Sequence, residues 1–211
     1  MSKVAISGNA SGTGTFTIQA PNSNTDRVLS LPDEAGTVLT SASSIPVANL
    51  DSAVGITGAD IWRLSTNYTT PNGNSYTIDN FWERADDATF AHVGTGMTQS
   101  SGIFTFPTTG IWYVSFTYGC YKSSAERYLG IIMQASSDSG SNWDDLTENL
   151  SSVHNAGVNA YQTGTSNVFI DVTDASQFRM RFITVSGSAI SYDGSTGQNR
   201  TYATFIRLGD T

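Results

Sequence analysis

This 211-residue chain has few cysteine, histidine and basic residues, and each shortage excludes a class of protein. One cysteine, Cys120, cannot form an internal disulfide, so we expect it to fill a small apolar space. The chain has ten Lys and Arg and eighteen Asp and Glu. Binding to nucleic acid or to an anionic membrane requires clustered cations, which this sequence lacks. No apolar run approaches the ~20 residues of a membrane span. We therefore expect no nucleic-acid partner, no membrane insertion and no cofactor.

Motifs of common enzymes are also absent. The sequence has no G-x-S-x-G, no H-E-x-x-H and no glycine-rich phosphate loop, and neither His92 nor His154 adjoins a nucleophile motif. Paired aspartates occur at 86–87 and 144–145. Neighbours on a strand point to opposite faces, so neither pair should flank one glycosidic bond. We predict a protein that is not an enzyme, with a polysaccharide depolymerase assembled between subunits as an alternative.

The chain does contain strong strand patterns in a weakly charged sequence. Only 13% of residues are charged, against about a quarter in an average soluble protein. Residues 102–119, GIFTFPTTGIWYVSFTYG, form two alternating runs around a turn at 107–110. Alternation places apolar residues on one face of a strand, which predicts a hairpin packed against a second sheet. The expected core residues are Phe104, Phe106, Trp112, Val114, Phe116, Phe169, Phe182 and Phe205.

The pattern F-x-F-P-x-x-G-I-W-Y-V-S-F in this hairpin resembles the globular heads of complement subcomponent q, which share a jelly roll with the tumour necrosis factor cytokines. It also resembles the fibre-tip domains of many phages. The family's glycine falls on Gly110, its first core aromatic on Trp112 and its last strand on residues 204–208. The resemblance implies an all-β, C-terminal jelly-roll β-sandwich that assembles as a parallel homotrimer.

Residues 13–40, TGTFTIQAPNSNTDRVLSLPDEAGTVLT, resemble the short β unit of phage tail-fibre and other virion fibre proteins. The segment contains two or three short strand patterns separated by Asn, Pro, Asp and Gly turns. So short a unit cannot bury enough surface alone and needs oligomerisation or a partner. We expect residues 1–40 to form an N-terminal β arm that attaches to another virion protein. Residues 41–59 fit a linker, as a helical turn, a three-chain stalk or a solvated loop, and residues 60–211 form the head.

The antiparallel order of the expected strands separates two ends of the head. We place strands at 60–66, 80–85, 90–94, 102–106, 111–120, 128–136, 143–153, 161–171, 177–186 and 200–208. The turns at 107–110, 137–142 and 172–176 then share one end with the stalk and the C-terminus. The loops at 121–127, 154–160 and 187–199 share the opposite end, which we call the far end.

Binding residues concentrate in loops on a rigid scaffold, so we expect the far end to contact a glycan or protein of the host cell surface. The alternative for each residue is an ordinary polar loop position. The expected receptor contacts are Tyr121, Lys122, Arg127, His154, Asn155, Tyr192, Asp193 and Arg200.

The turn at 136–143, SSDSGSNW, fits the S-x-D-x-G-x-x-W pattern of an Asp-box through Ser136, Asp138, Gly140 and Trp143. In that hairpin the carboxylate accepts hydrogen bonds from turn N–H groups and the Trp packs beneath. A single copy predicts a structural turn. A calcium site on Asp138, Asn142, Asp144 and Asp145 is the alternative, but the oxygen spacing and terminal Glu of an EF-hand loop are missing. We expect no metal.

Together the two resemblances imply a structural protein of a bacteriophage virion, a tail fibre or fibre tip that attaches the particle to its host. The alternatives are a head fibre or capsid decoration protein, and a non-viral adhesive head. Residues 1–6 pass directly into a strand pattern, so we expect no signal peptide. The protein is then expected to assemble in the host cytoplasm and to lie on the exterior of the particle.

Overall fold

The computed structural model describes residues 55–154 and 157–211, and short stretches of the N-terminal part at 8, 10–15, 17, 22–26 and 28. The chain divides into two compact units, Met1–Ser44 and Ile45–Thr211. All assigned strands lie in the second unit, the head. Most residues of the expected arm strands and of the expected linker lie outside the described residues. Among those described, no helix is long and apolar enough to cross a membrane.

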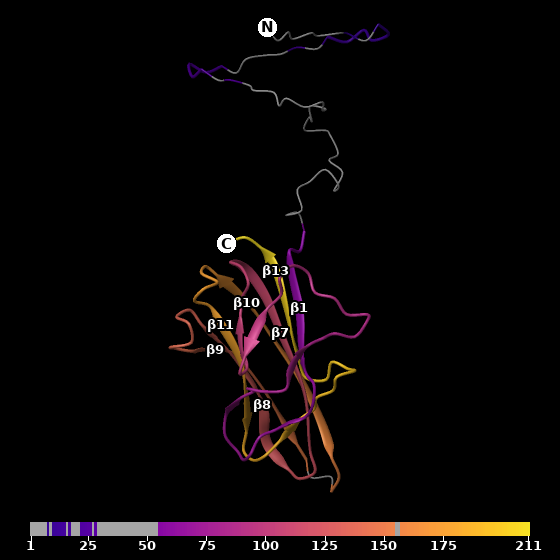
Figure 1. Ribbon diagram of the computed structural model, residues 1–211, viewed down its shortest axis with the longest axis vertical. Helices are drawn as coiled ribbons and strands as arrows, with labels where there is room; N and C mark the ends of the chain where they lie inside the picture. The colour runs from indigo at the N-terminus through magenta and orange to yellow at the C-terminus, as the bar shows by residue number, and fades with distance from the viewer. Residues whose placement is uncertain are drawn as a thin grey trace. The chain divides into compact units, whose positions relative to one another are not determined.

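Thirteen strands form two antiparallel sheets in the head (Figure 1). The first sheet has the order β2-β12-β7-β13-β1-β4, with β10 on β7. Its strands are β1 (Gly58–Leu64), β2 (Tyr68–Thr69), β4 (Trp82–Arg84), β7 (Gly110–Lys122), β10 (Ala160–Val172), β12 (Ser191–Tyr192) and β13 (Tyr202–Gly209). The second sheet has the order β5-β6-β11-β8-β9, with β3 on β11. Its strands are β3 (Tyr76–Thr77), β5 (Thr98–Ser100), β6 (Ile103–Thr105), β8 (Glu126–Ser136), β9 (Asp144–Val153) and β11 (Arg179–Ser186).

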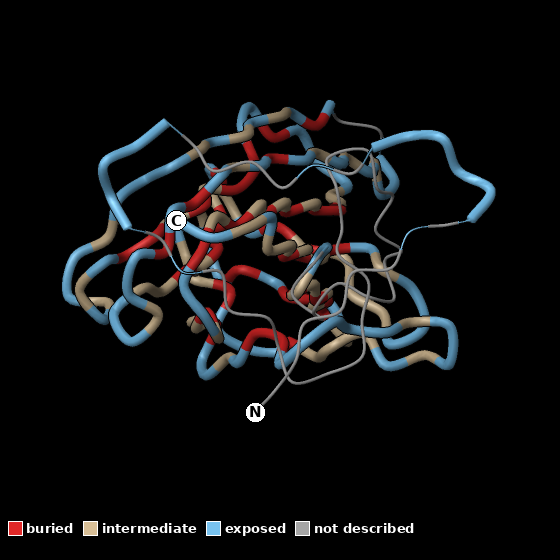
Figure 2. Tube along the Cα trace, turned by 90° about the horizontal axis from the view of Figure 1, so that it is seen from above, coloured by how far each residue is buried: buried red, intermediate tan, exposed pale blue. Residues whose placement is uncertain are grey.

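The two sheets pack face to face, and buried residues gather between the layers (Figure 2). Alternation along β7 buries every second side chain, from Trp112 through Cys120. Trp82 packs edge-on against Phe104 with ring centroids 5.1 Å apart, and its Nε1 donates to Ile78 O at 2.7 Å. Burial raises the pKa of the Cys120 thiol to about 12, as suits an inert core residue. Seven of the eight expected core residues are buried.

The eighth, Phe169, was expected in the core and is instead 67% exposed. It pairs with Tyr113 across β10 and β7, and paired residues point to the same side of a sheet. Tyr113 lies on the outer face, so Phe169 does too, and their ring centroids are 5.5 Å apart. Ile170 and Val172 supply the core side of β10. Asp171 lies two residues after Phe169 and therefore on the same face of the strand, and its charge was the signal in the sequence that this face is exposed.

The strand expected at 90–94 is also absent, because residues 85–97 form a loop, in which Val93 makes an isolated β-bridge with Ala59. The other nine expected strands occur with shifted ends. The short strands β2, β3, β5 and β12 were not expected. They have two or three residues each, too few to produce a readable alternation.

Strand register confirms the expected division between the two ends. Gly110 pairs with Val172, and Gly58 pairs with Arg207, so the β6–β7 and β10–β11 turns lie with the C-terminus. Gly110 has φ of +132°, and a Cβ there would lie 2.4 Å from Gly209 O, so this turn requires glycine. At the far end Lys122 pairs with Ala160. The 187–201 segment lies at that end too, because Ser191 pairs with Tyr121.

Candidate functional site

A pocket of about 460 Å³ opens on the outer face of the first sheet at the far end. Thr117 and Gly119 of β7 lie in its floor. Tyr161 and Thr163 of β10 form one wall. The opposite wall comes from the segment that links β12 to β13 and from the first residue of β13, namely Asp193, Asn199, Arg200 and Tyr202. The volume lies within the range of small-molecule sites.

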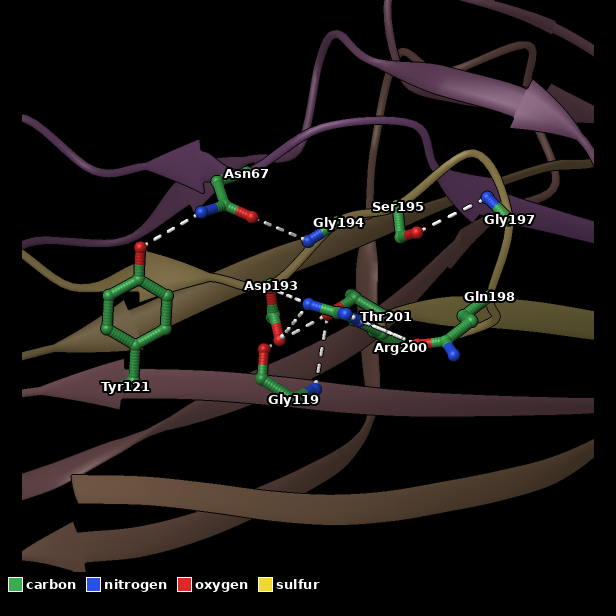
Figure 3. A network of polar contacts seen from close by, with 10 residues as sticks. All are labelled: Asn67, Gly119, Tyr121, Asp193, Gly194, Ser195, Gly197, Gln198, Arg200 and Thr201. Atoms are coloured by element: carbon green, nitrogen blue, oxygen red, sulfur yellow. Dashed lines mark hydrogen bonds and ion pairs between the residues drawn. The ribbon is translucent and has the colours of Figure 1, made fainter. Parts of the chain in front are cut away.

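Gly119 makes room for the pocket and anchors the loop above it. Its carbonyl accepts hydrogen bonds from Asp193 N at 2.7 Å and Thr201 Oγ1 at 3.1 Å, and its N–H lies 3.1 Å from the same Oγ1 (Figure 3). A Cβ at this position would lie 3.3 Å from Arg200 O and 3.9 Å from the Asp193 Cβ. The missing side chain therefore allows the loop to lie close over the sheet.

Asp193 and Arg200 form an ion pair at the pocket wall. Nη1 of Arg200 lies 3.1 Å from both carboxylate oxygens of Asp193. Nε and Nη2 of Arg200 donate to Oε1 of Gln198 at 3.3 and 3.2 Å (Figure 3). The guanidinium is thus held by two acceptors while 45% of the Arg200 side chain stays exposed. A fixed, solvent-accessible cation beside its own counter-ion provides both donors and acceptors for a ligand.

Asn67 connects the loop to the aromatic residues of the far end. Its Nδ2 donates to the hydroxyl of Tyr121 at 2.9 Å, and its Oδ1 accepts the Gly194 N–H at 2.9 Å (Figure 3). Tyr121 pairs across the sheet with Tyr161, and their ring centroids lie 5.3 Å apart. Asn67 therefore fixes both the start of the loop and one ring of this aromatic pair.

Asn199 adds an unsatisfied acceptor to the same wall. Its Oδ1 is buried and accepts no hydrogen bond from the part of the chain that the structure describes. A buried acceptor without a donor lowers stability by about 1–3 kcal/mol relative to a satisfied one. Such groups are uncommon in folded proteins and call for an explanation. Because this oxygen has almost no exposed surface, a ligand in the pocket does not reach it.

Three of the expected receptor contacts, Tyr121, Asp193 and Arg200, come together around this pocket. Tyr192 does not, and the expectation that it contacts a receptor is wrong. It pairs with Cys120, which faces the core, so its ring is fully buried and its hydroxyl donates to Gly130 O at 2.6 Å. Burial also raises the pKa of this phenol.

Of the remaining expected contacts, Lys122, Arg127 and His154 lie apart from the pocket. Nζ of Lys122 is 3.1 Å from Oε2 of Glu126, its side chain is largely buried, and Ser188 contacts both groups. This ion pair fastens the β7–β8 turn and leaves little of Lys122 to bind a ligand. Arg127 and His154 are exposed elsewhere at the far end. Asn155 lies outside the described residues.

Sequence reasoning missed Tyr161, Asn199 and Tyr202. Each lies in or beside an expected strand, and only the register brings them to one place. Tyr161 faces Tyr121 across β7 and β10, and Tyr202 faces Thr117 across β7 and β13. The sequence contained one signal, a glycine at 119 inside an otherwise bulky strand, which often marks a close approach of another backbone.

The Asp-box turn lies at the opposite end. Asp138 accepts from Asn142 N at 2.9 Å and from its Nδ2 at 2.6 Å, and Ser136 Oγ donates to it at 2.7 Å. Trp143 Nε1 donates to Gly140 O at 2.9 Å. The Arg181 guanidinium lies 4.1 Å from the Trp143 ring centre. The turn is therefore closed by its own side chains. Within the described residues, no three His, Cys, Asp or Glu side chains form a group that could hold a metal.

The aspartates of 86–87 lie in a loop, so the expected opposite orientation on a strand does not apply to them. Both contact Arg63, with N···O distances of 3.0 Å to Asp86 and 2.5 Å to Asp87, and Glu83 lies 2.8 Å from the same guanidinium. Phe90 lies 5.8 Å from it. Asp86 and Asp87 therefore anchor the 85–97 loop over Arg63, which is fully buried.

Comparisons with known proteins identify the fold. No protein-family model matches the sequence, and no curated protein matches it. Among solved structures, Eiger TNF from S. frugiperda is similar with a TM-score of 0.54 and 12% identity over 72% of this chain and 93% of that one. Murine APRIL at pH 8.5 gives a TM-score of 0.51 and 12% identity over 72% and 98%. The PRD1 vertex protein P5 gives a lower TM-score of 0.42, with 14% identity over 74% of this chain and 99% of that one. The head therefore has a TNF-like jelly-roll fold, as the hairpin predicted.

Proposed function

We propose that this chain is a non-enzymatic structural protein of a phage virion, a tail fibre or fibre tip whose head attaches the particle to its host. The observation that carries the proposal is the pocket at the far end, which lies opposite the C-terminus and the start of the head. A head carried on an N-terminal arm presents that end outward. The resemblance of residues 13–40 to the fibre β unit supports attachment of the arm to another virion protein.

Homotrimerisation is part of this proposal. Phe169 of β10 is exposed on the outer face of the first sheet, and Leu208 is exposed on β13, on the other side of β7. A hollow of about 230 Å³ lies beside Phe169 and is lined in part by Leu146 and Phe178. The β13 side of one copy fits against this hollow in the next copy. Contacts between two different surface regions close into a ring under rotational symmetry.

Locating the chain in purified particles tests the proposal. We expect mass spectrometry to find it in virions, and antibodies against the head to label fibre tips in electron micrographs. Purified head protein should also block adsorption of the particle to host cells. Label on the capsid surface would favour a head fibre or decoration protein instead. Release of reducing sugar from host polysaccharide would favour the depolymerase.

A further inference from the structure

The pocket at the far end combines aromatic surface with groups that bind hydroxyls. Tyr161 is 64% exposed and leans against Tyr121, so its outer ring surface is available to a ligand. Tyr202 lies on the opposite wall. Sugar rings present C–H groups on one face, and these pack against aromatic faces as apolar surface. The two walls are therefore suited to a flat, partly apolar ring between them.

The polar groups of the pocket form a mixed set of donors and acceptors. Arg200 offers N–H groups and Asp193 offers carboxylate oxygens. A sugar hydroxyl both donates and accepts, so adjacent hydroxyls can satisfy a donor and an acceptor that lie side by side. A ligand with only acceptors, such as a phosphate, would leave the carboxylate unmatched.

Charge narrows the ligand class further. The charged side chains in the pocket lining are Asp193 and Arg200, and they neutralise one another. An anionic ligand would have to displace Asp193 from Arg200 or approach its carboxylate, and leaving a charge unpaired in a partly buried site is costly. A neutral ligand binds without breaking the pair.

The pocket and the exposed Phe169 lie on the same outer face of the first sheet, near opposite ends of β7. Tyr113, which contacts the exposed Phe169, and Gly119 in the pocket floor lie six residues apart on β7, which corresponds to about 20 Å along a strand. Subunit contacts at the end near the C-terminus therefore need not cover the far end.

We infer that this pocket binds a single neutral sugar residue, a hexose unit of a cell-surface glycan, stacked on Tyr161 and hydrogen-bonded by Asp193 and Arg200. The inference rests on the proposed attachment function and names its ligand class. It also explains why the wall carries a fixed, partly exposed ion pair.

Saturation-transfer NMR on the full chain tests this with methyl glycosides of glucose, galactose and mannose, and with N-acetylneuraminic acid as the anionic probe. We expect at least one neutral glycoside to bind and the acid not to bind. Tyr161→Ala should weaken binding by about tenfold or more, as for a truncated aromatic anchor. Tyr128→Ala, at an exposed tyrosine outside the pocket, should leave binding unchanged. Ligand-induced amide shifts at Gly119 and Thr163 provide a readout that needs no variant.

Binding of the acid alone, no neutral binding, or full binding by Tyr161→Ala would overturn the inference. So would dissociation of the assembled protein by Tyr161→Ala, because the pocket would then be a subunit contact. Adsorption assays separate this inference from the proposed function. If the wild-type head binds host cells and Tyr161→Ala binds equally well, attachment stands and the sugar site fails. If glycosides bind but the head ignores host cells, the sugar site stands and attachment fails.

Discussion

Phe116 and Phe182 stack across the interior of the sandwich, with ring centroids 4.3 Å apart and an interplanar angle of 21°. One ring comes from β7 and the other from β11, so this contact joins the two sheets directly. Phe205 lies 6.3 Å from Phe182 and continues the cluster along the first sheet. The stack marks the part of the core where both sheets depend on each other.

Replacing Phe116 with Ala should therefore reduce the free energy of unfolding by about 3 to 5 kcal/mol, because a fully buried ring leaves a cavity. Urea unfolding followed by tryptophan fluorescence measures the loss. Tyr161→Ala, an aromatic truncation at an exposed site, should change the free energy by less than about 1 kcal/mol. Equal losses for the two variants would contradict the assignment of the core.

Phe169→Asp should convert the proposed trimer to monomer without unfolding it, because the charge would be buried in the contact between copies. The wild-type contact is expected to bury more than roughly 2,000 Å². Light scattering after gel filtration gives the mass, and circular dichroism reports the fold. Val158→Asp places the same charge at an exposed apolar residue that precedes β10, and should leave the trimer intact. A monomeric wild type at micromolar concentration would refute the trimer.

Hydrogen bonds from the Asn142 backbone N–H and side chain, and then from Ser136, lower the pKa of Asp138 from 3.8 to about 2. A lowered pKa in the folded state means that this carboxylate stabilises the fold above pH 4 and loses that contribution as the pH falls towards 2. NMR titration of the Asp138 carboxyl should give a midpoint near 2. In Asn142→Ala the pKa should rise only part of the way towards 3.8, because the backbone N–H of residue 142 still donates. In Ser141→Ala the pKa should stay low, because that hydroxyl donates to the Asp138 backbone carbonyl.

Arg63→Met should destabilise the head by about 1–3 kcal/mol, since it removes a buried cation that three carboxylates contact. The loss stays below that of a fully buried ion pair because the carboxylates retain contact with water. Asp86→Asn should have a much smaller effect, below about 1 kcal/mol, because that side chain is 77% exposed. Thermal melts at low and high salt compare the two variants. A larger loss of stability in Asp86→Asn than in Arg63→Met would contradict the assignment of Arg63 as the anchor of the 85–97 loop.

Deletion of residues 1–40 should leave a folded head that no longer enters particles. The strands Gly58–Gly209 close both sheets without the arm. Particle content is measured by immunoblot of purified virions, and the fold by circular dichroism. Normal incorporation of the shortened chain would contradict the docking role of the arm.

Alternation predicted the long strands and nearly all of the core, since side-chain direction follows from position in a strand. It failed at Phe169, where a bulky residue beside Ile170 obscured the phase. The residues of the candidate site were harder to predict from the sequence. The 187–199 loop was correctly placed at the far end. Tyr192 was wrongly expected on the surface, because the two-residue strand β12 leaves no periodic pattern. Tyr161 was missed because its partner Tyr121 lies 40 residues earlier, a pairing that only register specifies.

The loop above the pocket is attached mainly through main-chain groups. Asp193 N and Thr201 Oγ1 bind Gly119 O, Ser195 N donates to Leu64 O at 2.8 Å, and Leu64 N donates to Thr201 O at 2.9 Å. Main-chain anchors do not depend on which side chains stand between them. Residues 196–200 can therefore vary in sequence while the loop keeps its attachment to the sheet. A head of this design can change its binding preference by substitutions in one short stretch, without repacking its core.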